Sequence, residues 1–357
     1  LPMLHRGLGD PHLFTDLKRL GAVLTDRLRH DDRTQSVVLR DQLRDIKVEV
    51  RGFPRKSQLP DQPISHALVA FSWGSVGTKP LKGVRRVRYF LTDESGNLTA
   101  SGFEVGGGDL TAYRVDPVGG NVIMAPDLSK RSESYNGKVR PHGSLAFSVR
   151  FTLNEKTVVL FPAVPRSVYS LVDPRFAMPM RALKALDPAG RPARQFGYAF
   201  HGSRRDGVGV VFGPRGTDHA DRLKLVVDNG RMLLTNSQGA DSEAESRGIG
   251  YLLATESLAH SAWLGLQDMW QLTESRLRTM RRHVIENRRL TLLHQRTATL
   301  MAAADKARSE LRWSDYVAQL RAAVGTESRA YPDALGTLND VIKGLVFFLA
   351  LVIPAAF

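Results

Sequence analysis

The chain contains no cysteine among its 357 residues. Without thiols it cannot build a disulfide framework, bind a metal through thiolates or use a cysteine nucleophile. Any chemistry must therefore rest on carboxylate, histidine, serine or lysine side chains. The missing disulfides leave the compartment undecided, because periplasmic proteins need not contain them.

Several common signatures are also missing. There is no Gly-x-Ser-x-Gly elbow and no His-Glu-x-x-His pair. The glycines at 106–108 and 207–213 lack the spacing of a P-loop or a dinucleotide fingerprint, so we interpret them as turns and a β-bulge. No leader peptide precedes the first polar segment and the first residue is Leu1, so we expect a fragment of a larger protein.

Positive charge is abundant, with a formal net charge of +14. Such a chain attracts nucleic acid, anionic lipid headgroups or acidic polymers. The densest run comprises Arg276, Arg278, Arg281, Arg282, Arg288, Arg289 and Arg296. No aromatic platform or nucleic-acid motif accompanies it, so we expect a solvated helix face and no nucleic-acid partner. The alternative is contact with anionic headgroups through Arg276, Arg281, Arg282, Arg288 and Arg289.

The fold class expected from the pattern is multidomain β plus α. Residues 44–127 read as an antiparallel β-sandwich, because Ile46, Val48 and Val50 alternate and further apolar runs come after them. The segment Asp93–Gly96 is rich in turn formers and is predicted to be a hairpin tip.

A second β-domain is predicted over residues 144–238. Its strand candidates are 145–151, 157–161, 208–212 and 223–227. The small and polar stretch 239–250 separates this domain from the segment with a helical period.

Residues 252–340 are predicted to form a helical hairpin or stalk. Its first arm has one apolar stripe made of Leu266, Trp270, Leu277, Met280 and Val284. The second arm covers about 288–311, and Ser314 is expected to cap a third helix.

The run 344–357 has no charge and is apolar on every helical face. We interpret it as the start of a transmembrane helix, in contact with membrane lipid. Only Arg329 and Lys343 lie in the flanking window, so no Lys/Arg excess marks this flank as cytoplasmic. Residues 1–340 are therefore expected on the extracytoplasmic, periplasmic side of a bacterial membrane.

At the other end, residues 10–28 read as a helix that closes an upstream domain, 1–30. Asp10 and Pro11 suit its first turn. His5, together with Asp10 and His12, is a candidate corner of a metal site, because imidazole and carboxylate are zinc ligands. The competing interpretation is a set of polar residues before a helix cap.

Three parts of the chain resemble known families. Pro63–Val69 followed by Leu91–Leu98 resembles the carboxypeptidase regulatory-like domain, a transthyretin-type β-sandwich, although Leu98 stands where an aromatic residue is commoner. The segments 327–332 and 339–344 resemble the point where large bacterial proteins with an FtsX-like permease segment enter the membrane. His5–Leu28 resembles the tail of a zinc-aminopeptidase-like domain, with His5–Asp10 one residue longer than the usual spacing.

These observations predict a non-catalytic extracytoplasmic segment that positions an upstream domain above the bilayer and offers a surface to a protein partner. One alternative is part of a zinc-dependent aminopeptidase-like hydrolase, in which His5 would be a metal ligand. The other is a module that binds acidic glycan or anionic lipid. No cofactor is expected.

Overall fold

The structure, a computed structural model, describes residues 43–54, 57, 59–74, 85–104, 106–140, 143–149, 154–169, 172–173, 178–179, 182–202, 207–227, 233–237 and 248–356. The predicted helix over 10–28, the predicted domain 1–30 and the candidate ligand His5 all lie outside these residues.

The strands are β1 Leu43–Gly52, β2 Gln62–Pro63, β3 Leu68–Gly74, β4 Arg85–Leu91, β5 Asn97–Glu104, β6 Gly106–Val115, β7 Val122–Pro126, β8 Leu145–Val149, β9 Glu155–Val168, β10 Val172–Asp173, β11 Met178–Pro179, β12 Leu183–Leu186, β13 Gly197–Gly202, β14 Gly207–Pro214, β15 Lys224–Val227 and β16 Leu233–Leu234. The helices are η2 Lys130–Ser132, α3 Glu133–Asn136, η4 His219–Asp221, α5 Ser261–Arg282, α6 Arg288–Ser309 and α7 Trp313–Ala356.

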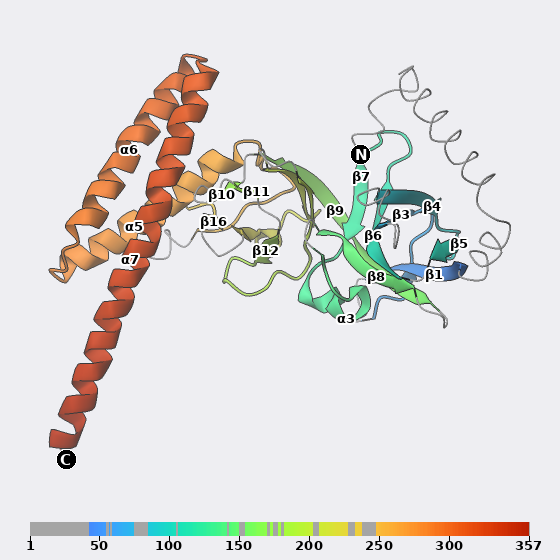
Figure 1. Ribbon diagram of the computed structural model, residues 1–357, viewed down its shortest axis with the longest axis horizontal. Helices are drawn as coiled ribbons and strands as arrows, with labels where there is room; N and C mark the ends of the chain where they lie inside the picture. Colours follow the sequence, from blue (N-terminus) through green and yellow to red (C-terminus); the bar gives the residue numbers. More distant parts are fainter. Residues whose placement is uncertain are drawn as a thin grey trace, which may run out of the picture.

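The chain combines a curled, mixed β-sheet with a C-terminal helical region (Figure 1). The main path of the sheet is β13-β14-β9-β7-β6-β3-β4, with β1, β2, β5 and β8 joined at its sides. The predicted alternation in β1 is confirmed, because Ile46, Val48 and Val50 are buried and their neighbours are not. Packed rings of Phe71, Phe103 and Phe147 fill the inside of the curl.

The sheet is mixed where an antiparallel sandwich was expected. Strand β1 pairs with β5 in the antiparallel sense but with β9 in the parallel sense, from Lys47 opposite Glu155 to Gly52 opposite Leu160. The parallel pairing arises because β9 arrives from far along the chain and places Val158 and Leu160 in the same core as β1. Sequence patterns report which face of a strand is buried, not the direction of its neighbour.

The strand pairing also crosses the boundary expected between the two β segments. Strand β9 pairs with β1 and β7 through its first part and with β14 through its last part. Strand β8 pairs with β6. Strands from both predicted segments, 44–127 and 144–238, therefore belong to one sheet.

The turn predicted at Asp93–Gly96 is present, but it is not the tip of a paired hairpin. Gly96 has φ +71°, its N–H donates to the carbonyl of Asp93 at 3.0 Å, and the Asp93 carboxylate accepts from Asn97 N–H at 2.7 Å. Among the described strands, however, β4 pairs with β3 and β5 pairs with β1. The strands diverge because buried Thr92 is held by Ile64 and Ala67, which steers the chain toward β1.

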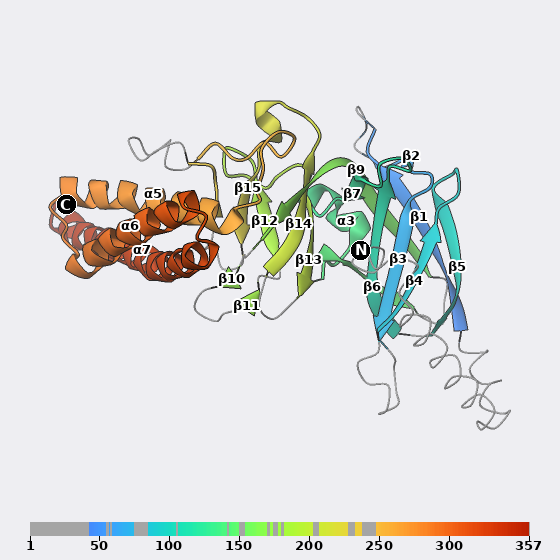
Figure 2. The ribbon, with the colours of Figure 1, turned by 90° about the horizontal axis from the view of Figure 1, so that it is seen from above.

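The second β segment shares a core with the helices. Strands β12, β15 and β16 form a small sheet, and its buried Leu225 and Leu234 belong to one cluster with Leu258, Leu266 and Leu320. Figure 2 shows this small sheet between the curled sheet and the helical region. The helices are thus packed onto the β part, not merely tethered to it.

The predicted helical segment is present: α5 and α6 follow the β part, and both pack with α7. Asn287 caps α6 by accepting the Leu290 N–H at 3.0 Å. Leu266, Leu277 and Met280 are buried as the stripe predicted, but Val284 lies beyond the end of α5 and is 86% exposed. The predicted apolar stripe extended beyond Arg282, where α5 ends.

Helix α7 differs most from expectation. The predicted third helix and the predicted membrane helix are one continuous element from Trp313 to Ala356. Pro332 lies between the two predicted segments and Pro354 within the second, and α7 continues through both prolines. Asn287 donates to Thr337 at 3.0 Å and Arg289 pairs with Asp333 at 3.3 Å. The α5–α6 loop therefore lies at the end of the bundle from which α7 continues outward (Figure 1).

Candidate functional site

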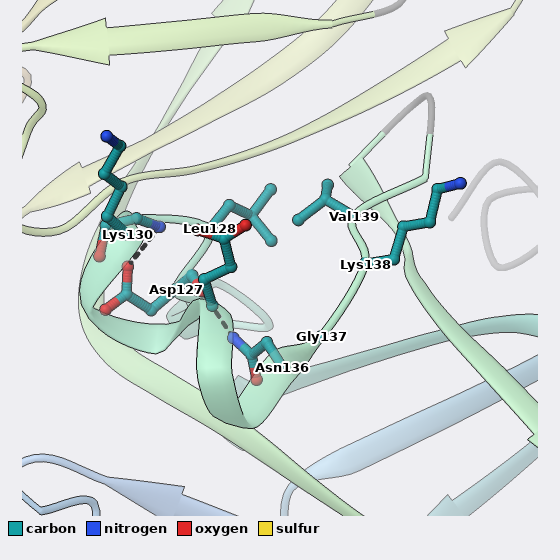
Figure 3. A pocket seen from close by; sticks show the side chains of 9 residues that line it. Asp127, Leu128, Lys130, Asn136, Gly137, Lys138 and Val139 are labelled. Carbon is teal, nitrogen blue, oxygen red and sulfur yellow. Dashed lines mark hydrogen bonds between the residues drawn. The ribbon is translucent and has the colours of Figure 1, made fainter.

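A cleft of about 580 Å³ lies beside the loop after β7 (Figure 3). It is lined by Asp127, Leu128, Ser129, Lys130, Glu133, Asn136, Gly137, Lys138 and Val139. The volume is in the range of small-molecule sites. Lys130 and Lys138 are both exposed and point away from each other in Figure 3, so they do not converge on one ligand.

The polar groups of this cleft are engaged in holding the loop. Fully buried Asp127 accepts from the Ser132 hydroxyl at 2.7 Å and from Ser129 N–H at 3.0 Å, while burial raises the pKa of its carboxyl. Asn136 donates to the Asp127 carbonyl at 2.6 Å and accepts from Val159 N–H at 2.7 Å. These contacts tie the loop to β9, and the arrangement is structural.

A second buried carboxylate fastens α5 to the small sheet. Asp268 accepts the backbone N–H groups of Thr235, Asn236 and Ser237 at 2.7, 3.0 and 2.8 Å, and the Tyr251 hydroxyl at 3.1 Å. Burial outweighs these hydrogen bonds and raises the pKa of Asp268 to about 6. Four donors on one carboxylate make Asp268 the anchor of this loop.

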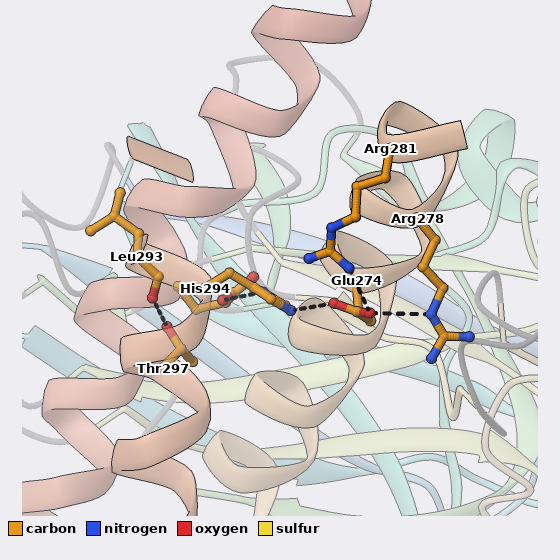
Figure 4. A network of polar contacts seen from close by, with 7 residues as sticks. Glu274, Arg278, Arg281, Leu293, His294 and Thr297 are labelled. Carbon is orange, nitrogen blue, oxygen red and sulfur yellow. Dashed lines mark hydrogen bonds and ion pairs between the residues drawn. The ribbon is translucent and has the colours of Figure 1, made fainter. Parts of the chain in front are cut away.

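A third polar cluster lies inside the helical bundle (Figure 4). His294 of α6 has its Nε2 3.0 Å from Glu274 of α5, and Glu274 also pairs with Arg278 at 3.1 Å and Arg281 at 3.7 Å. The ring of Trp270 stacks on His294 with centroids 4.8 Å apart. The cluster joins α5 to α6 through a hydrogen bond and ring stacking.

Glu327 approaches the same histidine from α7. Its Oε2 is 3.7 Å from His294 Nδ1, its side chain is fully buried, and neither of its oxygens accepts a hydrogen bond within the described chain. A buried carboxylate without partners is costly. The three groups do not make a metal site: in the part of the chain that the structure describes, no set of three His, Asp or Glu side chains could hold a metal ion.

The arginines considered as an alternative contact with headgroups separate into two classes. Arg276 packs over the Tyr331 ring at 4.8 Å and its Nη1 is buried, so it belongs to the bundle interior. Arg281, Arg282, Arg288 and Arg289 lie on or beside the α5–α6 loop, toward solvent. Arg281 and Arg289 have the carboxylate partners Glu274 and Asp333.

The described side chains in the last part of α7 are exposed. It is long and apolar enough to cross a membrane, and nothing in the described chain buries its most apolar stretch. The exposed apolar side chains are Val341, Ile342, Leu345, Val346, Phe347, Phe348, Leu349, Leu351, Val352 and Ile353.

Sequence reasoning did not single out Asp268, His294 or Glu327. A signal for Glu327 was available, because it stands among the small and apolar residues of α7 that face the other helices, between Val324 and Tyr331. Asp268 and His294 gave no comparable signal, since their partners come from distant segments.

Comparison with known proteins assigns no family. No protein-family model matches the chain, and no curated protein matches its sequence. A crystal structure of a mutant shaft pilin, spaA, from Lactobacillus rhamnosus GG aligns over 53% of this chain and 88% of its own, with 9% identity and a TM-score of 0.20. That score is too low to indicate a shared fold.

Proposed function

We propose that this chain is a non-catalytic, membrane-anchored support, in which helix α7 crosses the bilayer and the bundle and β part stand above it. The observation that carries the proposal is the continuity of α7 from Trp313 to Ala356. Its first part packs against α5 and α6, and its last part is bare and apolar. A single helix that is both bundle core and anchor fixes the soluble part to the membrane without a hinge.

The dimensions support the anchor. At about 1.5 Å per residue, the uncharged run Gly344–Ala356 is roughly 20 Å long, about two thirds of a hydrocarbon core of roughly 30 Å. Because apolar side chains surround the helix, a single soluble partner helix would cover only one side of it.

The curled sheet would serve as the rigid body. We propose that residues 44–127 with β8 and β9 are related to the regulatory-like sandwich that the sequence resembles, which the Thr92–Gly96 turn and the phenylalanine core support. Its role would be to hold an upstream domain at a fixed height, because the paired strands and the shared helical core leave few flexible joints.

We place residues 1–340 on the extracytoplasmic side. The fold brings Arg281, Arg282, Arg288 and Arg289 close to α7, but they are distant from it along the chain. The positive-inside rule counts charges within about 15–20 residues of the membrane segment, so these arginines do not change the sequence count.

The anchor is tested by flotation with liposomes. The full chain should rise with the vesicles and resist extraction by high salt or carbonate, whereas the chain ending at Asp340 should stay in the soluble fraction. If both remain soluble and monodisperse, the anchor is wrong.

The side of the membrane needs a separate test. Protease added to intact spheroplasts should digest the segment before Gly344, because that segment would be exposed. Full resistance with retained membrane binding would reverse the side and leave the anchor intact.

A further inference from the structure

The loop between α5 and α6 presents an apolar side chain to solvent. Val284 is 86% exposed and has φ +59°, a conformation that β-branched residues rarely adopt. The turn is held by Val284 N–H to the Arg281 carbonyl at 3.1 Å and by Ile285 N–H to the Met280 carbonyl at 2.9 Å. This is the helix-ending turn in which glycine is usual, so valine occupies a position where it costs stability.

The α6–α7 loop, at the other end of the bundle, provides a comparison. Leu311 has φ +58°, is 68% exposed and sits in the same kind of turn, with its N–H bonded to Arg308 and Arg312 N–H bonded to Ala307. The backbone and the exposed apolar side chain are therefore matched. The two loops differ in charge and in position.

Around Leu311 the arginines are neutralised. Arg308 pairs with Asp305 at 2.6 Å, and Arg312 pairs with Glu310 and with Asp315. Around Val284, by contrast, the exposed Arg282 and Arg288 make no ion pair within the described residues. Unpaired cations beside an exposed apolar side chain are the pattern of segments that bind anionic membrane surfaces.

Position points to the same surface. Asn287, at the end of this loop, contacts Thr337 of α7 at 3.0 Å. The bare apolar stretch of α7 begins at Val341, about 6 Å further along the helix. An arginine side chain can span that distance into a headgroup layer beside the hydrocarbon core.

We propose that the α5–α6 loop is a second membrane contact, in which Val284 enters the interfacial layer and Arg282 and Arg288 bind anionic lipid headgroups. This inference rests on the proposed anchoring of α7. Two contacts would define the tilt of the bundle on the bilayer, because α7 alone leaves rotation about its axis free.

The absence of cysteine permits a direct test. Val284→Cys and Leu311→Cys variants of the full chain carry an environment-sensitive fluorophore and are incorporated into nanodiscs of phosphatidylcholine with or without phosphatidylglycerol. The probe at 284 should emit at shorter wavelength and be quenched by lipids spin-labelled near the headgroup. The matched probe at 311 should report water. Equal signals at the two positions would overturn the proposal.

Charge is tested with Arg282→Gln and Arg288→Gln in the 284-labelled chain. Each should weaken contact of the loop roughly fivefold in discs containing phosphatidylglycerol, equivalent to about 1 kcal/mol for each cation near an anionic surface. Pure phosphatidylcholine should abolish the difference between the variants. Contact that is insensitive to both changes would remove the anionic-lipid assignment.

The nanodisc experiment distinguishes failure of the proposed anchoring from failure of the second contact. If the labelled chains do not enter the discs, the proposed anchoring fails. If they enter and the 284 probe remains in water, only the second contact fails. An unlabelled Val284→Gly variant checks folding, because glycine suits φ +59° and should raise the free energy of unfolding while removing the apolar side chain.

Discussion

Two buried carboxylates of the bundle region have opposite surroundings. Asp268 receives four hydrogen bonds and is 4% exposed, whereas Glu327 is fully buried and receives none within the described chain. A buried charge is tolerated when donors replace water and is costly when they do not. Replacing each carboxylate by its amide should therefore change the free energy of unfolding in opposite directions.

The first prediction concerns the pH dependence of Asp268. Burial raises its pKa from the ordinary 3.8 to about 6, so the folded state binds this proton more tightly than the unfolded state. Its contribution, on the order of 3 kcal/mol, should be complete below about pH 4 and lost as the pH rises through 6. The measurement is the free energy of unfolding in urea from pH 4 to 8.

Asp268→Asn is the control for that titration. Its absolute stability should be lower, because an amide cannot accept all the backbone donors, but the pH dependence assigned to Asp268 should vanish. An unchanged slope in the variant would show that other groups produce it.

The second prediction compares Glu327→Gln with Glu274→Gln. Replacing the Glu327 carboxyl, which accepts no hydrogen bond within the described chain and lies 3.7 Å from His294 Nδ1, should raise the free energy of unfolding by about 1–3 kcal/mol. Glu274→Gln should lower it by about 1–2 kcal/mol, because Glu274 lies within pairing distance of Arg278, Arg281 and His294. Urea denaturation of both variants at pH 7.5 gives the signs, and a loss in both variants would mean that the contact of Glu327 with His294 stabilises the bundle.

At the scale of elements, α7 carries three glycines, and Gly325 and Gly336 lie before its exposed apolar stretch. A Cβ at Gly325 or Gly336 would meet nothing within 4 Å, so neither glycine is required for packing. Each lowers helix stability by about 1 kcal/mol relative to alanine. They weaken the part of α7 that packs against the other helices.

The third prediction concerns those glycines. Gly325→Ala and Gly336→Ala should each raise the free energy of unfolding by about 0.5–1 kcal/mol and slow hydrogen exchange in α7. Gly96→Ala serves as the contrast, because Gly96 has φ +71° and its Cβ would lie 2.7 Å from the Val50 carbonyl. That variant should be destabilised; a gain there would contradict the turn geometry.

The sequence predicted individual helices and strands better than it predicted which of them pair or pack together. The helical period identified the arms that became α5 and α6, and the alternation in β1 identified its buried face, because both patterns are local. Pairing is not local: nothing in residues 44–127 indicates that β1 lies beside β9. For the same reason the arginine count found the basic run, but not that Arg276 faces inward onto Tyr331.

At the scale of the whole molecule, β9 joins the curled sheet to the core shared by the small sheet and the helices. Its Val158 and Leu160 belong to the core of the curled sheet, and Val168 belongs to the core that the small sheet shares with the helices. Displacement of α7 can thus reach the curled sheet through packed elements. A support needs such continuity, because a flexible linker would uncouple the membrane from the domain above it.

The fourth prediction asks whether residues 43–127 fold without β9. This fragment lacks Val158 and Leu160, both fully buried, and loses the parallel partner of β1 along Lys47–Gly52. Two buried aliphatic side chains are worth about 2–5 kcal/mol each, which is comparable to the whole stability of a small domain. The fragment should give an unfolded circular dichroism spectrum and poorly dispersed amide resonances. Residues 43–169 restore β8 and β9 and should fold, whereas dispersed resonances from 43–127 alone would establish the first β segment as an independent domain.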